Sequence, residues 1–123
     1  MYKAITLDFD GKVARIGLNR PQVLNAIDSE MKIELLAAIR SLAEQDSINV
    51  AVIYGHGKHF STGVDLKDSA VNPWEHTPEG WSEHFNYLIN AAKAIWDLEI
   101  PVITAVKGFC LGCLLYTSPS PRD

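Results

Sequence analysis

The sequence has little cysteine, no long apolar run and no excess of positive charge, and each absence excludes a class of protein. Two cysteines in 123 residues cannot supply the disulfide framework of a small secreted domain. No apolar run approaches the ~18–20 residues that cross a bilayer, and residues 1–8 lack the apolar stretch of a secretory signal. Fifteen acidic residues against eleven Lys and Arg give a formal charge of −4, unlike a nucleic-acid-binding surface. We therefore expect a cytoplasmic protein that binds neither nucleic acid nor membranes.

The composition is that of one globular domain followed by an atypical tail. A hydrophobic fraction of 47% and a charged fraction of 21% fit a folded domain and exclude a disordered chain. Residues 113–123 carry no amphipathic period and hold two of the six prolines. This segment resembles translated sequencing-adapter DNA, so we treat it as a non-native tail and exclude it from the fold. A natural Ser/Pro-rich tail is the alternative, and it too would lack a fixed structure.

Neither cysteines nor histidines predict a metal site. Cys110 and Cys113 have Cys-x-x-Cys spacing, but the second lies in the excluded tail and no other pair completes a zinc site. Cys110 is therefore interpreted as a small apolar residue. His56 and His59 lie three residues apart in a predicted loop with no third ligand in view.

Four short segments have the pattern of β-strands. Residues 2–9 and 12–18 alternate between apolar and polar on either side of an Asp-Gly turn, which predicts a β-hairpin. Residues 49–54 and 101–106 are apolar and rich in β-branched side chains, so we expect strands buried on both faces.

Two helices separate these strands. An apolar stripe predicts an amphipathic helix over residues 29–45, with Asp28 as its N-cap. Its polar side chains are expected to face away from the core: Lys32, Glu34, Arg40 and Glu44. A second helix should start near Pro78 and end before Pro101, with an apolar stripe of Trp81, Phe85, Leu88, Ala92 and Ile95 or Trp96. We expect the tryptophans to line the core or an apolar pocket. The element order predicts an α/β fold in which a hairpin leads into a parallel layer.

Each of the two apolar strands is followed by a turn that contains glycine, at residues 60–65 and 108–112. Glycine lets a backbone approach a ligand closely, and a turn that opens a helix leaves N–H groups without intrahelical partners. Two such donors on one carbonyl oxygen form an oxyanion hole, typically worth a few kcal/mol per donor. The spacing does not show whether the turns meet, so ordinary connections remain an alternative.

Several motifs taken together resemble the enoyl-CoA hydratase/isomerase (crotonase) superfamily. They are Asn19-Arg20-Pro21 with Asn25-Ala26-Ile27, then Phe60-Ser61-Thr62-Gly63-Val64-Asp65-Leu66, then Pro101-Val102-Ile103-Thr104-Ala105-Val106 with Gly108-Phe109-Cys110-Leu111-Gly112. They follow the family order and cover residues 1–112. The resemblance implies a crotonase-like (ClpP/crotonase) β-β-α spiral core, of which this is the N-terminal part. Residues 1–112 would then form a partial acyl-CoA-binding domain.

The resemblance also implies a site. The N–H of Val64 would be the first oxyanion donor, and the second would come from a glycine run that starts at Gly112. The residues that would contact CoA are Leu24, Ala26, Val64, Asp65, Leu66 and Lys67, with Lys67 placed to meet a phosphate. CoA would be part of the substrate, and no separate cofactor is implied. Cys113 and Leu114 stand where the glycine run would continue, so the second donor turn is expected to be badly formed.

The implied function is stabilisation of an enolate of an acyl-CoA thioester in fatty acid metabolism, most commonly hydration of a 2-enoyl-CoA by a lyase. Tyr116 stands where one catalytic glutamate is expected, and the second would fall beyond Asp123, so this chain should be inactive. The longer parent is expected to be a homo-oligomer, a trimer or hexamer. The alternative is a non-catalytic α/β binding or assembly module on the same scaffold.

Overall fold

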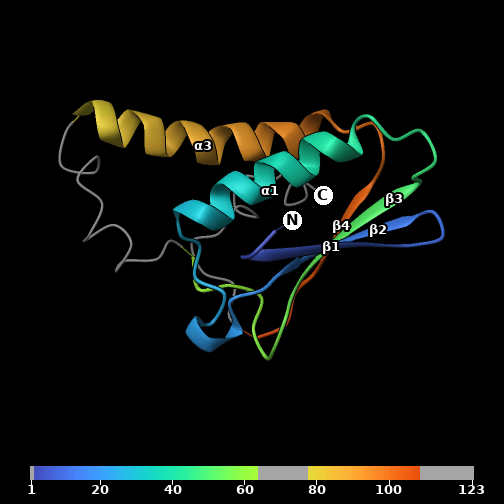
Figure 1. Cartoon of the computed structure of the whole chain (residues 1–123), viewed down its shortest axis with the longest axis horizontal. Helices are drawn as coiled ribbons and strands as arrows, with labels where there is room; N and C mark the ends of the chain where they lie inside the picture. Colours follow the sequence, from blue (N-terminus) through green and yellow to red (C-terminus); the bar gives the residue numbers. More distant parts are fainter. Residues whose placement is uncertain (1, 64–77, 109–123) are drawn as a thin grey trace.

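A computed structural model describes residues 2–63 and 78–108 as an α/β fold with one four-stranded sheet. The strands lie in the order β1-β2-β3-β4, and the two helices α1 and α3 cover the same face of the sheet (Figure 1). α1 contacts β1 and β2, and α3 packs against α1. The predicted α/β class, with a hairpin leading into a parallel layer, is confirmed.

The hairpin consists of β1 (Ile5–Asp10) and β2 (Val13–Leu18), paired antiparallel from Ile5↔Leu18 to Asp10↔Val13. Gly11 occupies the turn with a φ of 62°, a conformation that glycine adopts without steric cost. On the exposed surface of the hairpin, the hydrogen bond and the negative charge of Asp8 raise the pKa of the Arg15 guanidinium. Both side chains are about half exposed, so this ion pair contributes little to stability.

Helix α1 spans Ser29–Leu42 and is capped as predicted. The Asp28 carboxylate accepts a hydrogen bond from the backbone N–H of Met31 at 2.9 Å, which satisfies one of the unpaired donors of the first turn. The helix ends three residues before the predicted end at residue 45. The expectation that Lys32 faces away from the core is wrong, because its side chain is buried. Glu34, also expected to face away, is half-buried and binds the start of β1.

Strands β3 (Val50–Gly55) and β4 (Val102–Ala105) extend the sheet in parallel, and α3 (Pro78–Asp97) precedes β4 in the chain. The prediction that both strands are buried on two faces is wrong. Burial alternates along β3, and Ile103 in β4 is 54% exposed. The physical reason is that both described helices lie on one face of the sheet, so alternate residues point away from the core (Figure 1).

The hydrophobic core lies between the sheet and the helices. It combines Ile5, Ala14, Ile16, Leu18, Ala51 and Ile53 from the strands with Met31, Leu35, Ala38, Ile39 and Leu42 from α1. From α3, Ile95 packs against this cluster, whereas Trp96 is 56% exposed, so the placement of Trp96 in the core is wrong. Within residues 2–63 and 78–108, neither helix has the length and apolar content that crossing a bilayer requires.

Candidate functional site

Three connecting segments meet where the parallel strands end. β2, β3 and β4 run in the same direction, so their carboxyl ends lie at one edge of the sheet. The chain leaves this edge through residues 19–27, 56–63 and 106–108 (Figure 1). Ligands of open α/β sheets bind outside the carboxyl ends of the strands, so these three segments form the candidate site.

The described starts of the two glycine turns, Phe60 and Gly108, each contact residues just before the other turn. The backbone N–H of Phe60 donates to the carbonyl oxygen of Lys107 at 2.8 Å, which ties the segment after β3 to the segment after β4. Gly108 has a φ of 63°, and a Cβ added there would lie 2.7 Å from the carbonyl oxygen of Lys58 and would also clash with the His59 ring. Glycine is therefore required at 108 by both the backbone conformation and the close approach.

Loop 24–27, which contains two predicted CoA contacts, pairs with the segment that leads to residue 64. The N–H of Thr62 donates to the carbonyl of Leu24 at 3.2 Å, and the N–H of Ile27 donates to the carbonyl of Gly63 at 2.7 Å. Leu24 has a φ of 58° and is 41% exposed, so its side chain remains available to a ligand. Ala26 is half-buried. Two stretches that lie far apart in the sequence are thus adjacent in the fold.

The remaining predicted site residues cannot be placed. Val64, Asp65, Leu66 and Lys67 lie outside the described residues, and so does Gly112. Their roles stay predictions. The first described stretch of the chain ends at Gly63, directly before Val64, and Gly63 has a φ of 92°.

Two buried polar residues at the site were given no role by sequence reasoning. Asn25 and Ser61 are both fully buried, at 0% exposure. The Asn25 side chain bonds to the backbone of Arg20, His56 and His59, and the Ser61 hydroxyl bonds to the backbone of Asn25 and Gly63. Both residues stand within the motifs that carry the family resemblance. For Asn25, a polar side chain between the apolar residues Leu24 and Ala26 was a signal in the sequence.

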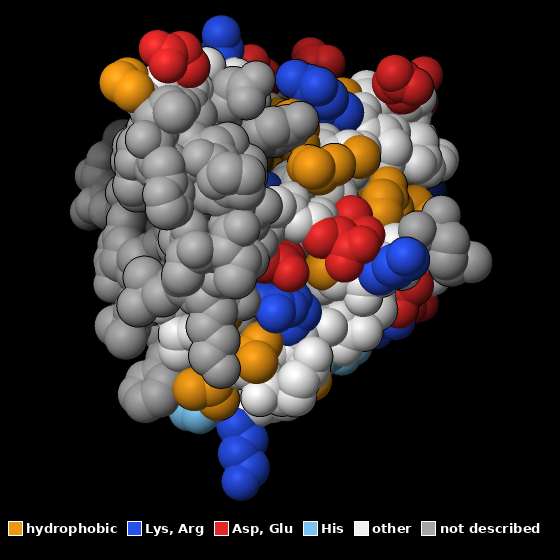
Figure 2. Space-filling model, turned by 60° about the vertical axis from the view of Figure 1, so that its left-hand side comes forward, with side chains coloured by type: hydrophobic (Ala, Val, Ile, Leu, Met, Phe, Trp, Pro, Cys, Tyr) orange, Lys and Arg blue, Asp and Glu red, His pale blue; other side chains and the backbone are white. Residues whose placement is uncertain are grey.

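Arg20 is a basic residue of the first of these segments. Its guanidinium donates to the carbonyl oxygen of Ala26 at 2.7 Å and lies 3.6 Å from the Asp28 carboxylate. These contacts fix the loop against the start of α1. On the face seen in Figure 2, acidic and basic side chains lie interspersed over the described surface.

The side chain of His56 packs against neighbouring strands. His56 Nε2 lies 2.9 Å from the Thr6 hydroxyl and 3.4 Å from the Tyr54 hydroxyl. These three side chains lie over Gly17, where an added Cβ would collide with all of them. Among residues 2–63 and 78–108, no group of three or more His, Cys, Asp or Glu side chains could hold a metal ion.

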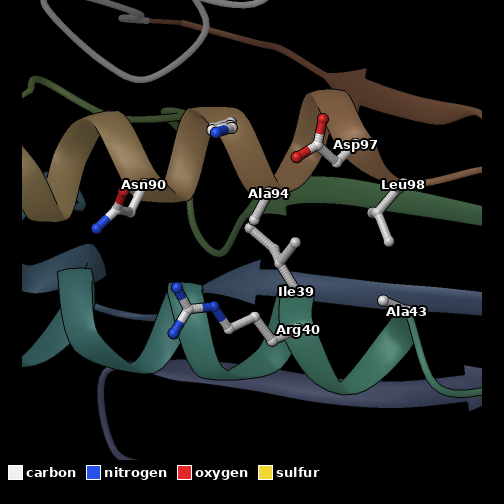
Figure 3. A pocket seen from close by; sticks show the side chains of 8 residues that line it. Ile39, Arg40, Ala43, Asn90, Ala94, Asp97 and Leu98 are labelled. Atoms are coloured by element: carbon white, nitrogen blue, oxygen red, sulfur yellow. The ribbon is translucent and has the colours of Figure 1, made fainter.

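A groove of about 350 Å³ lies away from these segments, between α1 and α3 (Figure 3). Its walls include Ile39 and Arg40 from α1 and Asn90, Ala94 and Asp97 from α3. None of the residues predicted for the site lines this groove. The candidate site therefore remains at the edge of the sheet where β2, β3 and β4 have their carboxyl ends, which we call the carboxyl edge.

The chain is similar to known proteins over most of its length. Residues 8–115 match the family model described as enoyl-CoA hydratase/isomerase. A peroxisomal Delta(3,5)-Delta(2,4)-dienoyl-CoA isomerase of Arabidopsis thaliana is 32% identical over 111 residues, covering 84% of this chain and 40% of the relative. A short-chain-enoyl-CoA hydratase of Clostridium acetobutylicum is 34% identical over 110 residues, covering 88% of this chain and 40% of the relative.

The fold is shared with solved structures as well. An enoyl-CoA hydratase/isomerase from Xanthobacter autotrophicus Py2 superimposes with a TM-score of 0.80 at 32% identity, covering 89% of this chain and 40% of the other. The crotonase-like fold expected from the motifs is therefore confirmed for its N-terminal part. The chain spans about two fifths of the length of the curated relatives it matches. The family match, the sequence identity and the shared fold agree, and this chain belongs to the enoyl-CoA hydratase/isomerase family.

Proposed function

We propose that the carboxyl edge of the sheet forms part of a site for an acyl-CoA thioester, with the backbone N–H of Val64 as a donor to the thioester oxygen. The observation that carries the proposal is the pairing of loop 24–27 with Thr62 and Gly63. It brings the predicted CoA contacts Leu24 and Ala26 next to the segment that directly precedes Val64. An acyl-CoA that lies along this loop would have its thioester close to that segment.

The chemistry needs donors that act most strongly when the thioester oxygen becomes negative. A backbone N–H fixed before reaction stabilises such an oxyanion by a few kcal/mol, because no reorganisation is needed as the charge develops. In this proposal Asp65, Leu66 and Lys67 contact the CoA moiety, and a second donor comes from the turn that begins at Gly112. The enolate is stabilised by the peptide groups, without a separate cofactor.

For the whole protein, we propose hydration of a 2-enoyl-CoA as the reaction, in a cytoplasmic trimer or hexamer. The similarity to a dienoyl-CoA isomerase supports isomerisation as a second candidate, because an enolate serves both reactions and the acid and base groups decide between them. The present chain should hydrate no enoyl-CoA, since Tyr116 stands where the resemblance puts a glutamate. Any loss of crotonyl-CoA absorbance catalysed by this chain would contradict that expectation.

The test is calorimetric titration of butyryl-CoA and of free CoA into this chain and into two variants. Val64→Pro removes the proposed donor N–H, whereas Val64→Ala keeps it and serves as the matched control. We expect Val64→Pro to bind the thioester about tenfold more weakly than Val64→Ala, equivalent to about 1.4 kcal/mol, with the same free CoA affinity in the two variants. Equal thioester affinities for the two variants would refute the donor role, and no binding of either compound by the unaltered chain would refute the site.

A further inference from the structure

The side chain of Asn25 bonds to three backbone groups, which lie in two of the segments at the candidate site. Its Oδ1 accepts from the N–H of Arg20 at 2.8 Å, and its Nδ2 donates to the carbonyls of His56 and His59, both at 2.9 Å. Both amide protons are therefore used. Asn25 has a φ of 56°, a left-handed conformation that asparagine tolerates better than most residues. The space is tight, since a Cβ at Gly55 would lie 2.9 Å from Nδ2.

The hydroxyl of Ser61 continues this arrangement toward the glycine turn. Its Oγ donates to the carbonyl of Asn25 at 2.8 Å and accepts from the N–H of Gly63 at 3.0 Å. The carbonyl of Gly63 in turn accepts from the N–H of Ile27 at 2.7 Å. Both sides of Gly63 are thus held, its N–H by Ser61 and its carbonyl by the loop that contains Asn25.

We propose that Asn25 and Ser61 are positioning residues, which hold the Gly63 peptide against loop 24–27 so that the amide following Gly63 meets the thioester oxygen. This inference rests on the proposed function and adds two residues to it. A peptide group is planar, so fixing the Gly63 carbonyl also fixes the plane that contains the next N–H. An oxyanion donor is effective only if the direction of its N–H is set before the reaction.

The pattern of hydrogen bonds favours positioning over general core stability. A buried polar side chain is costly unless its groups are satisfied, and an apolar side chain of similar size avoids that cost. Here every hydrogen bond described for the side chains of Asn25 and Ser61 goes to the backbone of the segments at the candidate site. Neither side chain caps a helix. Their described bonds align two loops with each other.

The first test measures amide hydrogen exchange in the unaltered chain by NMR, without a ligand. If the arrangement is a single unit, the amides of Gly63 and Ile27 are both protected and exchange at rates within about threefold of each other. Gly63 exchanging like an exposed amide while Ile27 stays protected would overturn the inference, whatever the chain binds. This measurement does not depend on a variant that folds.

The second test uses Ser61→Ala and Asn25→Asp, with Ser41→Ala as the matched control. Ser41 also donates one hydroxyl bond, to Ala38 at 2.7 Å, but lies in the last turn of α1. We expect Ser61→Ala and Asn25→Asp to accelerate Gly63 and Ile27 exchange about tenfold and Ser41→Ala to leave it unchanged. Equal rates in all three variants would overturn the inference.

A third readout separates positioning from the proposed function itself. In Ser61→Ala, the infrared shift of a ¹³C-labelled thioester carbonyl in bound butyryl-CoA should fall by about half, while free CoA affinity changes less than twofold. An unchanged shift despite faster Gly63 exchange would overturn the link to the donor. If the unaltered chain does not bind the thioester, the proposed function fails, and the exchange rates alone decide whether Asn25 and Ser61 hold the turn.

Discussion

Replacing Glu34 with alanine should lower the free energy of unfolding by about 3 kcal/mol. Glu34 lies in the middle of α1, and its carboxylate accepts hydrogen bonds from three consecutive backbone N–H groups, two just before β1 and one at its first residue. The backbone nitrogen of Lys3 lies 3.0 Å from each carboxylate oxygen of Glu34. The nitrogens of Ala4 and Ile5 lie 2.8 Å and 3.2 Å from Oε1. One side chain therefore ties the start of the edge strand to the helix that covers the sheet.

The magnitude follows from which of these bonds are protected from water. Lys3 is exposed, so water replaces the carboxylate there at little cost. Ala4 and Ile5 are buried, and in Glu34→Ala each loses its hydrogen bond to the charged carboxylate. A well-formed bond of this kind contributes roughly 1.5–3 kcal/mol to stability. The bond to Ile5 is long, which brings the sum to about 3 kcal/mol. Glu34→Gln keeps one acceptor oxygen but no charge, so about half of that loss is expected.

The assay is urea unfolding followed by far-ultraviolet circular dichroism, with the midpoint and slope fitted separately. Glu44→Ala is the control, because Glu44 is an exposed carboxylate just past the end of the same helix and should change stability by less than about 0.5 kcal/mol. A Glu34→Ala variant within about 0.5 kcal/mol of this control would refute the reasoning. It would mean that water satisfies the N–H groups of β1 as well as the carboxylate does.

Three further outcomes are expected. Gly55→Ala places a Cβ 2.5 and 2.6 Å from the carbonyl oxygens of His59 and Phe60, so we expect about 1–3 kcal/mol of destabilisation and weaker thioester binding; an unchanged urea midpoint would contradict this. Asp28→Ala removes the N-cap of α1 and should cost about 1 kcal/mol in urea unfolding, whereas Asp28→Asn keeps a capping oxygen and should recover most of it. The exposed apolar side chains of Ile103 and Val106 should cause self-association, and a sharp monomeric peak in gel filtration with cooperative melting would contradict that expectation.

Local patterns predicted the elements whose structure depends on neighbouring residues. The hairpin follows from two alternating runs around an Asp-Gly turn, and α1 follows from its apolar stripe and the cap at Asp28. Burial could not be predicted in the same way. Apolar residues in β3 and β4 gave no sign that the described helices cover one face only, and Ile103 is therefore exposed where a buried side chain was expected. The role of Glu34 was missed for the same reason, because its partners come from a distant strand.

The contact between the two glycine turns depends on strand register, which the sequence of either turn does not contain. In the sheet Tyr54 pairs with Ala105, so β3 and β4 end at the same level and the segments that follow start side by side. A shift of two residues would keep every side chain on its own face but move the Lys107 carbonyl about 7 Å along the strand, breaking its bond to Phe60. The glycines permit the close approach of the turns, whereas the register brings them together. The oxyanion site that we propose would therefore depend on the pairing of β3 with β4 as much as on its own glycines.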